Sequence, residues 1–95
     1  MKEEAAMTPT PELQRRLMYI LFRALNDARS LALGGRSEQV AELADAVENL
    51  PSEMNHWRDD SLESILFQLR TYEGKFPGAA RYSQYLESVP VPDRY

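Results

Sequence analysis

The stretch TPELQRRLMYILFRALNDARSLALGG, residues 10–35, decides the fold. Thr10 can cap a helix N-terminus, and Pro11 stands at the first helical position, where its missing N–H group costs nothing. Gly34 and Gly35 end the pattern, because glycine accepts the left-handed conformation that closes a last turn. The sequence therefore predicts a helix over residues 11–33. Its apolar residues recur at helical spacing, and the expected buried stripe is Leu13, Leu17, Ile20, Leu21, Ala24, Leu25, Ala28 and Leu31.

Three more helical segments follow. One is expected over 37–50, where Pro51 disfavours helical geometry in the residue before it. The next begins after Asp60, an N-cap residue with a glutamate three positions later, and ends at Gly74. A short fourth is expected over 79–87. The connection of about four residues between the first two helices indicates an antiparallel hairpin. The predicted fold is an all-α bundle of three main helices plus a short C-terminal fourth.

Composition supports this fold class. The chain has 12 Leu against 2 Ile and 4 Val, and the scarcity of β-branched residues favours helices over sheets. A chain of 95 residues has room for one core. We therefore expect a flexible N-terminal tail over 1–9, one helical-bundle domain over 10–88 and an extended, proline-rich C-terminal tail over 89–95.

Charge and cysteine content exclude several classes of protein. The absence of cysteine rules out disulfides and thiol catalysis, and it suits a reducing cytoplasm, which is the expected location. No apolar run approaches the ~18 residues of a membrane helix, and the N-terminal residues do not have the pattern of a signal peptide. The net charge of −4, spread evenly along the chain, argues against general nucleic-acid binding.

The first helix has more apolar surface than one buried stripe requires. Met18, Tyr19, Phe22 and Leu33 lie beside that stripe, so that apolar side chains occupy about half of the circumference, where a surface helix shows little more than 100°. Phe67 lies off the main stripe of the third helix. Two interpretations stay open at this point. Either the later helices cover these side chains, or the side chains form a surface for a protein partner or for a second copy of the chain.

The second helix carries an acidic face made of Glu38, Glu42 and Asp45. The hairpin would bring Arg29 close to Glu42, so mutual pairing is one interpretation. The other is an inhibitor of the immunity or antitoxin type that binds a basic protein. We expect no metal site, because the acids point away from the core and His56 is the only histidine.

The C-terminal third interleaves basic residues with aromatic rings, a pattern that also occurs in proteins that bind single-stranded nucleic acid. The tyrosines, however, fall at positions expected to face the core. No serine lies in a nucleophile-elbow pattern, and no glycine-rich loop follows a strand, so we expect neither a catalytic site nor a cofactor. The basic and aromatic residues of this C-terminal pattern are Arg70, Tyr72, Lys75, Phe76, Arg81, Tyr82, Tyr85, Arg94 and Tyr95.

The segment LADAVENLP, Leu43 to Pro51, resembles a segment of small, uncharacterised, all-helical bacterial proteins. The resemblance implies a bacterial origin and an all-α fold, and it brings no activity. From the residues themselves we expect a non-catalytic protein–protein interaction module. It would form a homodimer or bind a protein partner through the first helix, without a small-molecule substrate.

Overall fold

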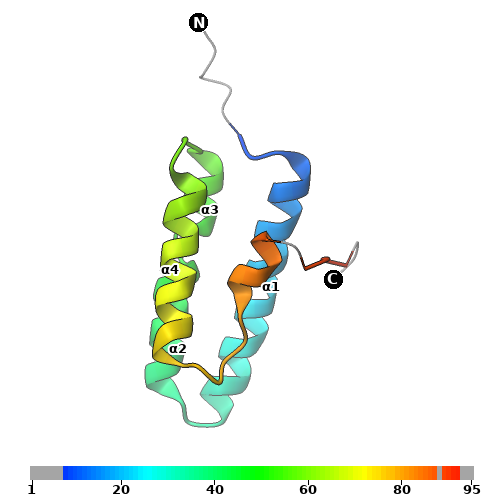
Figure 1. The fold of residues 1–95 in the computed structure, drawn as a ribbon. Coiled ribbons are helices and arrows are strands. Elements are labelled where there is room, and N and C mark those ends of the chain that lie inside the picture. The colour runs from blue at the N-terminus through cyan, green and yellow to red at the C-terminus, as the bar shows by residue number, and fades with distance from the viewer. Residues whose placement is uncertain (1–7, 88, 93–95) are drawn as a thin grey trace, which may run out of the picture.

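Four α-helices and one 3-10 helix make up the chain over residues 8–87 and 89–92, the part that the computed structural model describes (Figure 1). No strand occurs in that part of the chain, so the all-α fold class is confirmed. Of the predicted tails over 1–9 and 89–95, residues 1–7 and 93–95 lie outside the described residues. In chain order the elements are α1 (Pro11–Leu33), α2 (Ser37–Val47), α3 (Leu50–Asn55), α4 (Ser61–Lys75) and η2 (Tyr82–Leu86).

Helix α1 begins and ends where the sequence predicts. The hydroxyl of Thr10 accepts a hydrogen bond from the backbone N–H of Leu13 (3.2 Å), which satisfies a donor in the first turn. At the other end Gly35 adopts φ = 77°, and the next N–H, from Arg36, returns to the carbonyl oxygen of Leu31 (2.9 Å). Both boundaries depend on local chemistry, which a sequence displays directly.

The predicted end of the second helix is wrong. Helix α2 stops at Val47, and a separate short helix, α3, begins at Leu50, so Pro51 opens a helix and does not terminate one. Proline is tolerated in a first turn because the N–H groups there have no partner within the helix. Leu50 is buried and packs in the core, and its burial offsets the unfavourable geometry before proline.

Helix α4 differs from its prediction in detail. Asp60 occupies the N-cap position, as expected, but its side chain makes no capping hydrogen bond. The neighbouring hydroxyl of Ser61 instead accepts a hydrogen bond from the backbone N–H of Arg58 (2.8 Å) and holds the preceding turn. The helix also passes through Gly74 and ends one residue later, at Lys75.

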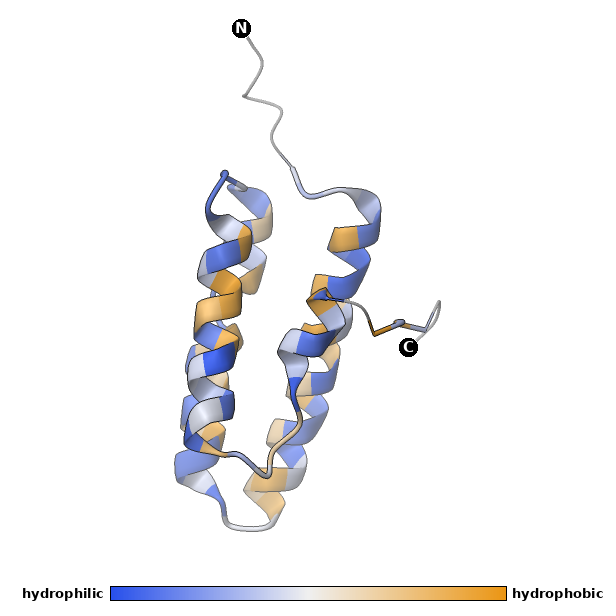
Figure 2. Ribbon diagram, in the orientation of Figure 1, coloured by the Kyte–Doolittle hydropathy of each residue, from blue (hydrophilic) through white to orange (hydrophobic). Residues whose placement is uncertain are grey.

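The helices pack around one core (Figure 1). Helix α1 runs antiparallel to α2, α4 packs beside α2, and η2 contacts both α1 and α4. Hydrophobic residues lie on the sides of α1 and α4 that face each other (Figure 2). The buried core consists of Leu17, Ile20, Ala24, Leu43, Ala46, Val47, Leu50, Ile65, Leu69, Tyr72 and Tyr82.

The short fourth helix is a 3-10 helix, which is narrower than the α-helix and rarely exceeds three or four residues by itself. Hydrogen bonds to two other helices hold η2 in place. The hydroxyl of Tyr82 donates a hydrogen bond to Asp27 of α1. The buried Ser83 donates to Glu73 of α4 through its backbone N–H (2.9 Å) and its hydroxyl (2.8 Å). These bonds join η2 to two helices that do not follow one another in the chain.

Candidate functional site

The face of α1 that points away from the bundle exposes large apolar side chains. Met18 is 42% exposed, Phe22 39%, Leu25 64% and Leu33 77%. Three of these residues had been expected on the wide apolar face, whereas Leu25 had been assigned to the buried stripe. Leu31 packs against the core, and Leu25 precedes it by six residues. At about 100° per residue, Leu25 therefore points about 120° away from Leu31 around the helix axis. Among the described residues, no other element covers Leu25 in that direction.

Two of these exposed residues, Met18 and Leu25, belong to a regular pattern. Met18, Leu21, Leu25, Ala28 and Ala32 follow one another at intervals of three, four, three and four residues, which is the spacing of the seam between two paired helices. We name these five residues the outer stripe. Leu21 and Ala28 are half-buried and also pack against the core, so the outer stripe adjoins the core along one edge. Phe22 and Leu33 flank its other edge.

Tyr19 does not belong to this exposed face, contrary to expectation. It is only 8% exposed, and its ring packs edge-on against Tyr85 of η2, with the ring centroids 5.1 Å apart and an interplanar angle of 82°. Arg23 donates a hydrogen bond to the Tyr19 hydroxyl (3.1 Å) and lies 6.0 Å above the ring centroid. This hydrogen bond raises the pKa of Arg23 above its ordinary value. Tyr19 therefore attaches η2 to α1.

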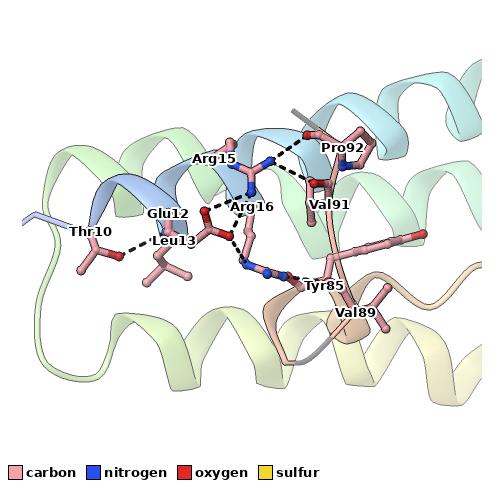
Figure 3. A network of polar contacts seen from close by, with 9 residues as sticks. All are labelled: Thr10, Glu12, Leu13, Arg15, Arg16, Tyr85, Val89, Val91 and Pro92. Atoms are coloured by element: carbon pink, nitrogen blue, oxygen red, sulfur yellow. Dashed lines mark hydrogen bonds and ion pairs between the residues drawn. The ribbon is translucent and has the colours of Figure 1, made fainter. Parts of the chain in front are cut away.

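Two arginines hold the C-terminal segment on the same side of α1 (Figure 3). Arg16 donates to the carbonyl oxygens of Tyr85 and Val89 (both 2.8 Å). Arg15 donates to the carbonyl oxygens of Val91 (3.1 Å) and of the following proline (2.7 Å). The segment is thus tied through its backbone, and Val91 is buried. This side of α1 is covered, and the outer stripe is left as its uncovered side.

Glu12 orients both arginines. Its carboxylate accepts hydrogen bonds from Arg15 Nη2 (3.0 Å) and Arg16 Nε (2.9 Å). The hydrogen bond from Arg15 is the largest cause of a lowered pKa at Glu12. The Glu12 side chain is exposed, so these ion pairs contribute little to stability, and their effect is to fix the two guanidinium groups.

Phe67, the fifth predicted contact residue, lies elsewhere. It is 71% exposed on α4 and borders a shallow hollow of about 230 Å³ together with Glu42 and Asp45 of α2. The structure therefore separates Phe67 from Met18 and Phe22 and brings it to the acidic face.

The acidic face is smaller than the sequence indicates. Glu38 and Asp45 are exposed, but Glu42 is half-buried and accepts a hydrogen bond from Lys75 of α4 (2.9 Å). The expected partner of Glu42 had been Arg29, across the hairpin. The packing of α4 beside α2 supplies a different cation.

Two aromatic rings of the basic and aromatic C-terminal third are buried. Tyr72 and Tyr82 are 2% and 1% exposed and belong to the core. Arg70 pairs with Glu87. Base stacking requires accessible ring faces, which these two buried tyrosines do not offer.

His56 is exposed at the end of α3, where its Nδ1 lies 3.2 Å from the carbonyl oxygen of Ser52. Trp57 beside it is half-buried against the core. Within residues 8–87 and 89–92, no group of three or more histidine and carboxylate side chains could hold a metal ion. None of the described helices is long and apolar enough to cross a membrane.

Comparison with protein-family models finds no match, and neither do comparisons with curated proteins and with solved structures. The resemblance of Leu43–Pro51 to bacterial helical proteins stays a prediction. The outer stripe of α1 is accordingly the feature from which we argue function.

Proposed function

We propose that this chain is a non-catalytic protein–protein interaction module that self-associates through the outer stripe of α1. The observation that carries the proposal is the exposure of Met18, Phe22, Leu25 and Leu33 along one face of one helix. Single exposed apolar residues are ordinary, but a contiguous apolar surface is typical of an interface. The lack of cysteine suits a reducing compartment, and the proposal includes a cytoplasmic location.

The sizes of the side chains along the outer stripe favour pairing with a second copy of the chain. The outer stripe is large at its N-terminal end, where Met18 and Leu21 lie, and small at its C-terminal end, where Ala28 and Ala32 lie. An antiparallel, two-fold pairing brings large residues opposite small ones, which lets the side chains interdigitate. In one such register Leu21 faces Ala32 of a second copy, and Leu25 faces Ala28.

The size of the stripe sets the expected strength. From Met18 to Ala32 it spans about four turns, or about 21 Å. Such a stripe provides less than the roughly 800 Å² per partner of a standard stable interface. We therefore expect a dimer that dissociates on dilution through the micromolar range.

The test is molar mass by light scattering during size-exclusion chromatography, over a hundredfold range of concentration. The wild type should pass from monomer to dimer. Leu25→Glu should remain monomeric, because it places a charge at the centre of the stripe, and its circular dichroism should match the wild type. Ala41→Glu is the matched control, since Ala41 is an exposed helical residue of α2 and lies outside the stripe.

Two outcomes would contradict the proposal. One is a wild-type monomer at every concentration. The other is a dimer that Leu25→Glu leaves unchanged, since this would place the interface on another surface.

A further inference from the structure

A cavity of about 580 Å³ lies between the C-terminal half of α1, the start of α2 and the end of α4. The loop over 76–80 forms its remaining wall. Volumes of roughly 300–1,000 Å³ are typical of pockets for small ligands. Neither the outer stripe nor the acidic face contributes to its lining. The cavity is therefore a separate feature of the fold.

The lining is positively charged, although the whole chain has a net charge of −4. Arg23, Arg36 and Lys75 contribute three cations, and Asp27 contributes the one carboxylate. Asp27 already accepts the hydrogen bond from Tyr82, which also lines the cavity. The lining has a net charge of +2, from three positive groups and one negative group.

Arg36 is the cation most available to a ligand. Its side chain is exposed and makes no hydrogen bond or ion pair with any other described residue. Arg23 uses one of its five N–H donors on Tyr19. Lys75 pairs with Glu42, which lies outside the cavity lining, and its ammonium group keeps two further donors. All three cations thus retain donors for an anion.

Neutral polar groups and aromatic rings complete the cavity. Gln39 donates a hydrogen bond to the hydroxyl of Tyr72 (3.0 Å), whose own O–H has no acceptor among the described residues. Phe76 lines the cavity beside Tyr72, with the ring centroids 5.4 Å apart. A flat apolar wall next to a cationic group fits a ligand that combines a planar ring with an anion.

We propose that this cavity binds a small phosphate monoester that carries a planar ring. The phosphate, with a charge of about −1.5 to −2 at neutral pH, matches the cations Arg23, Arg36 and Lys75. Arg36 supplies the guanidinium fork, which suits phosphate oxygens. The ring lies against Phe76. The site is independent of self-association through α1.

The test uses adenosine 5′-monophosphate as the probe, with calorimetric titration of the full chain at low salt. Binding should saturate, and adenosine and inorganic phosphate should each bind more weakly than the nucleotide. Arg36→Gln should weaken binding by about tenfold or more, because it removes charge-assisted hydrogen bonds. Arg58→Gln is the matched control, because it makes the same change of charge at an exposed arginine outside the cavity.

Added salt should weaken nucleotide binding, since the attraction is between exposed charges. Amide NMR signals of Gly78 and Ala79 should shift during the titration, because both residues line the cavity. The proposal is overturned if the nucleotide does not saturate at millimolar concentration or if Arg58→Gln weakens binding as much as Arg36→Gln. Equal affinity for inorganic phosphate and the nucleotide would overturn the role of the ring.

Discussion

The hydroxyl of Tyr82 donates a hydrogen bond to a carboxylate oxygen of Asp27, and this bond joins η2 to α1 across 55 residues of sequence. Tyr82 is almost fully buried and belongs to the core. Burial removes its hydroxyl from water, and the negative charge of Asp27 opposes a phenolate beside it. Both effects raise the pKa of Tyr82 far above its ordinary value.

Tyr82→Phe should lower the free energy of unfolding at neutral pH by about 1–3 kcal/mol, because it leaves the Asp27 carboxylate without its donor. Urea unfolding followed by circular dichroism measures the change. Tyr85→Phe serves as control, since Tyr85 contributes its ring to Tyr19 and its carbonyl oxygen to Arg16. An equal loss of unfolding free energy in both variants would mean that the hydrogen bond to Asp27 does not contribute to stability.

The raised pKa of Tyr82 predicts a loss of stability in alkali. Above about pH 10, the ordinary pKa of tyrosine, the unfolded chain releases this proton while the folded chain keeps it. The folded state then binds more protons, so the free energy of unfolding falls as the pH rises. Tyr82→Phe lacks this contribution. The difference in free energy of unfolding between wild type and variant should therefore become smaller above about pH 10. A gap that stays constant between pH 8 and pH 11 would contradict the assignment.

Arg16→Ala should release the C-terminal segment from α1. Arg16 is partly buried and donates to the carbonyl oxygens of Tyr85 and Val89. Loss of these charge-assisted bonds should cost about 1–3 kcal/mol and should speed hydrogen exchange over residues 82–92. Mass spectrometry of exchanged peptides measures this, with Arg58→Ala as control. Unchanged exchange over 82–92 would show that apolar packing alone holds the segment.

The turn between α1 and α2 offers a matched pair of glycines. Gly35 has φ = 77°, which L-residues adopt at a cost of roughly 1–2 kcal/mol, whereas Gly34 has φ = −86°. A Cβ atom on Gly34 would meet ordinary van der Waals contacts at 3.5 Å. Gly35→Ala should therefore destabilise the fold by about 1–2 kcal/mol, and Gly34→Ala by much less. Thermal unfolding distinguishes the two, and equal losses would place the strain elsewhere.

Two leucines of α1 should respond differently to truncation. Leu17 is fully buried, so Leu17→Ala should cost about 2–5 kcal/mol through lost burial and a cavity. Leu25 is 64% exposed, and Leu25→Ala should change monomer stability by no more than about 0.5 kcal/mol. Urea unfolding at submicromolar concentration keeps association out of the comparison. A large loss at Leu25 under those conditions would mean that the side chain is covered within the monomer.

The all-α fold and the bounds of α1 could be predicted from the sequence, because local chemistry determines them. A threonine cap, a proline in the first turn and a pair of glycines act within a few residues of themselves. The outer stripe could be predicted in part. Met18, Phe22 and Leu33 were recognised from the width of the apolar face, and all three are exposed.

The side of α1 that becomes buried was decided only by tertiary structure. Tyr19 is covered because Arg16 binds backbone oxygens that lie 69 and 73 residues away in the chain. Leu25, on the other side, stays 64% exposed. Helical spacing shows which residues share a face, but it does not show which face another element covers.

The same reason explains the cavity and the acidic face. Arg23, Arg36 and Lys75 come from separate parts of the chain, and only the packing of α1, α2 and α4 brings them to one cavity. Lys75 likewise reaches Glu42 because α4 packs beside α2. Local sequence thus determined the three longest helices, α1, α2 and α4, and both ends of α1. Packing determined which charges and apolar side chains meet, because such contacts depend on the orientation of several helices at once.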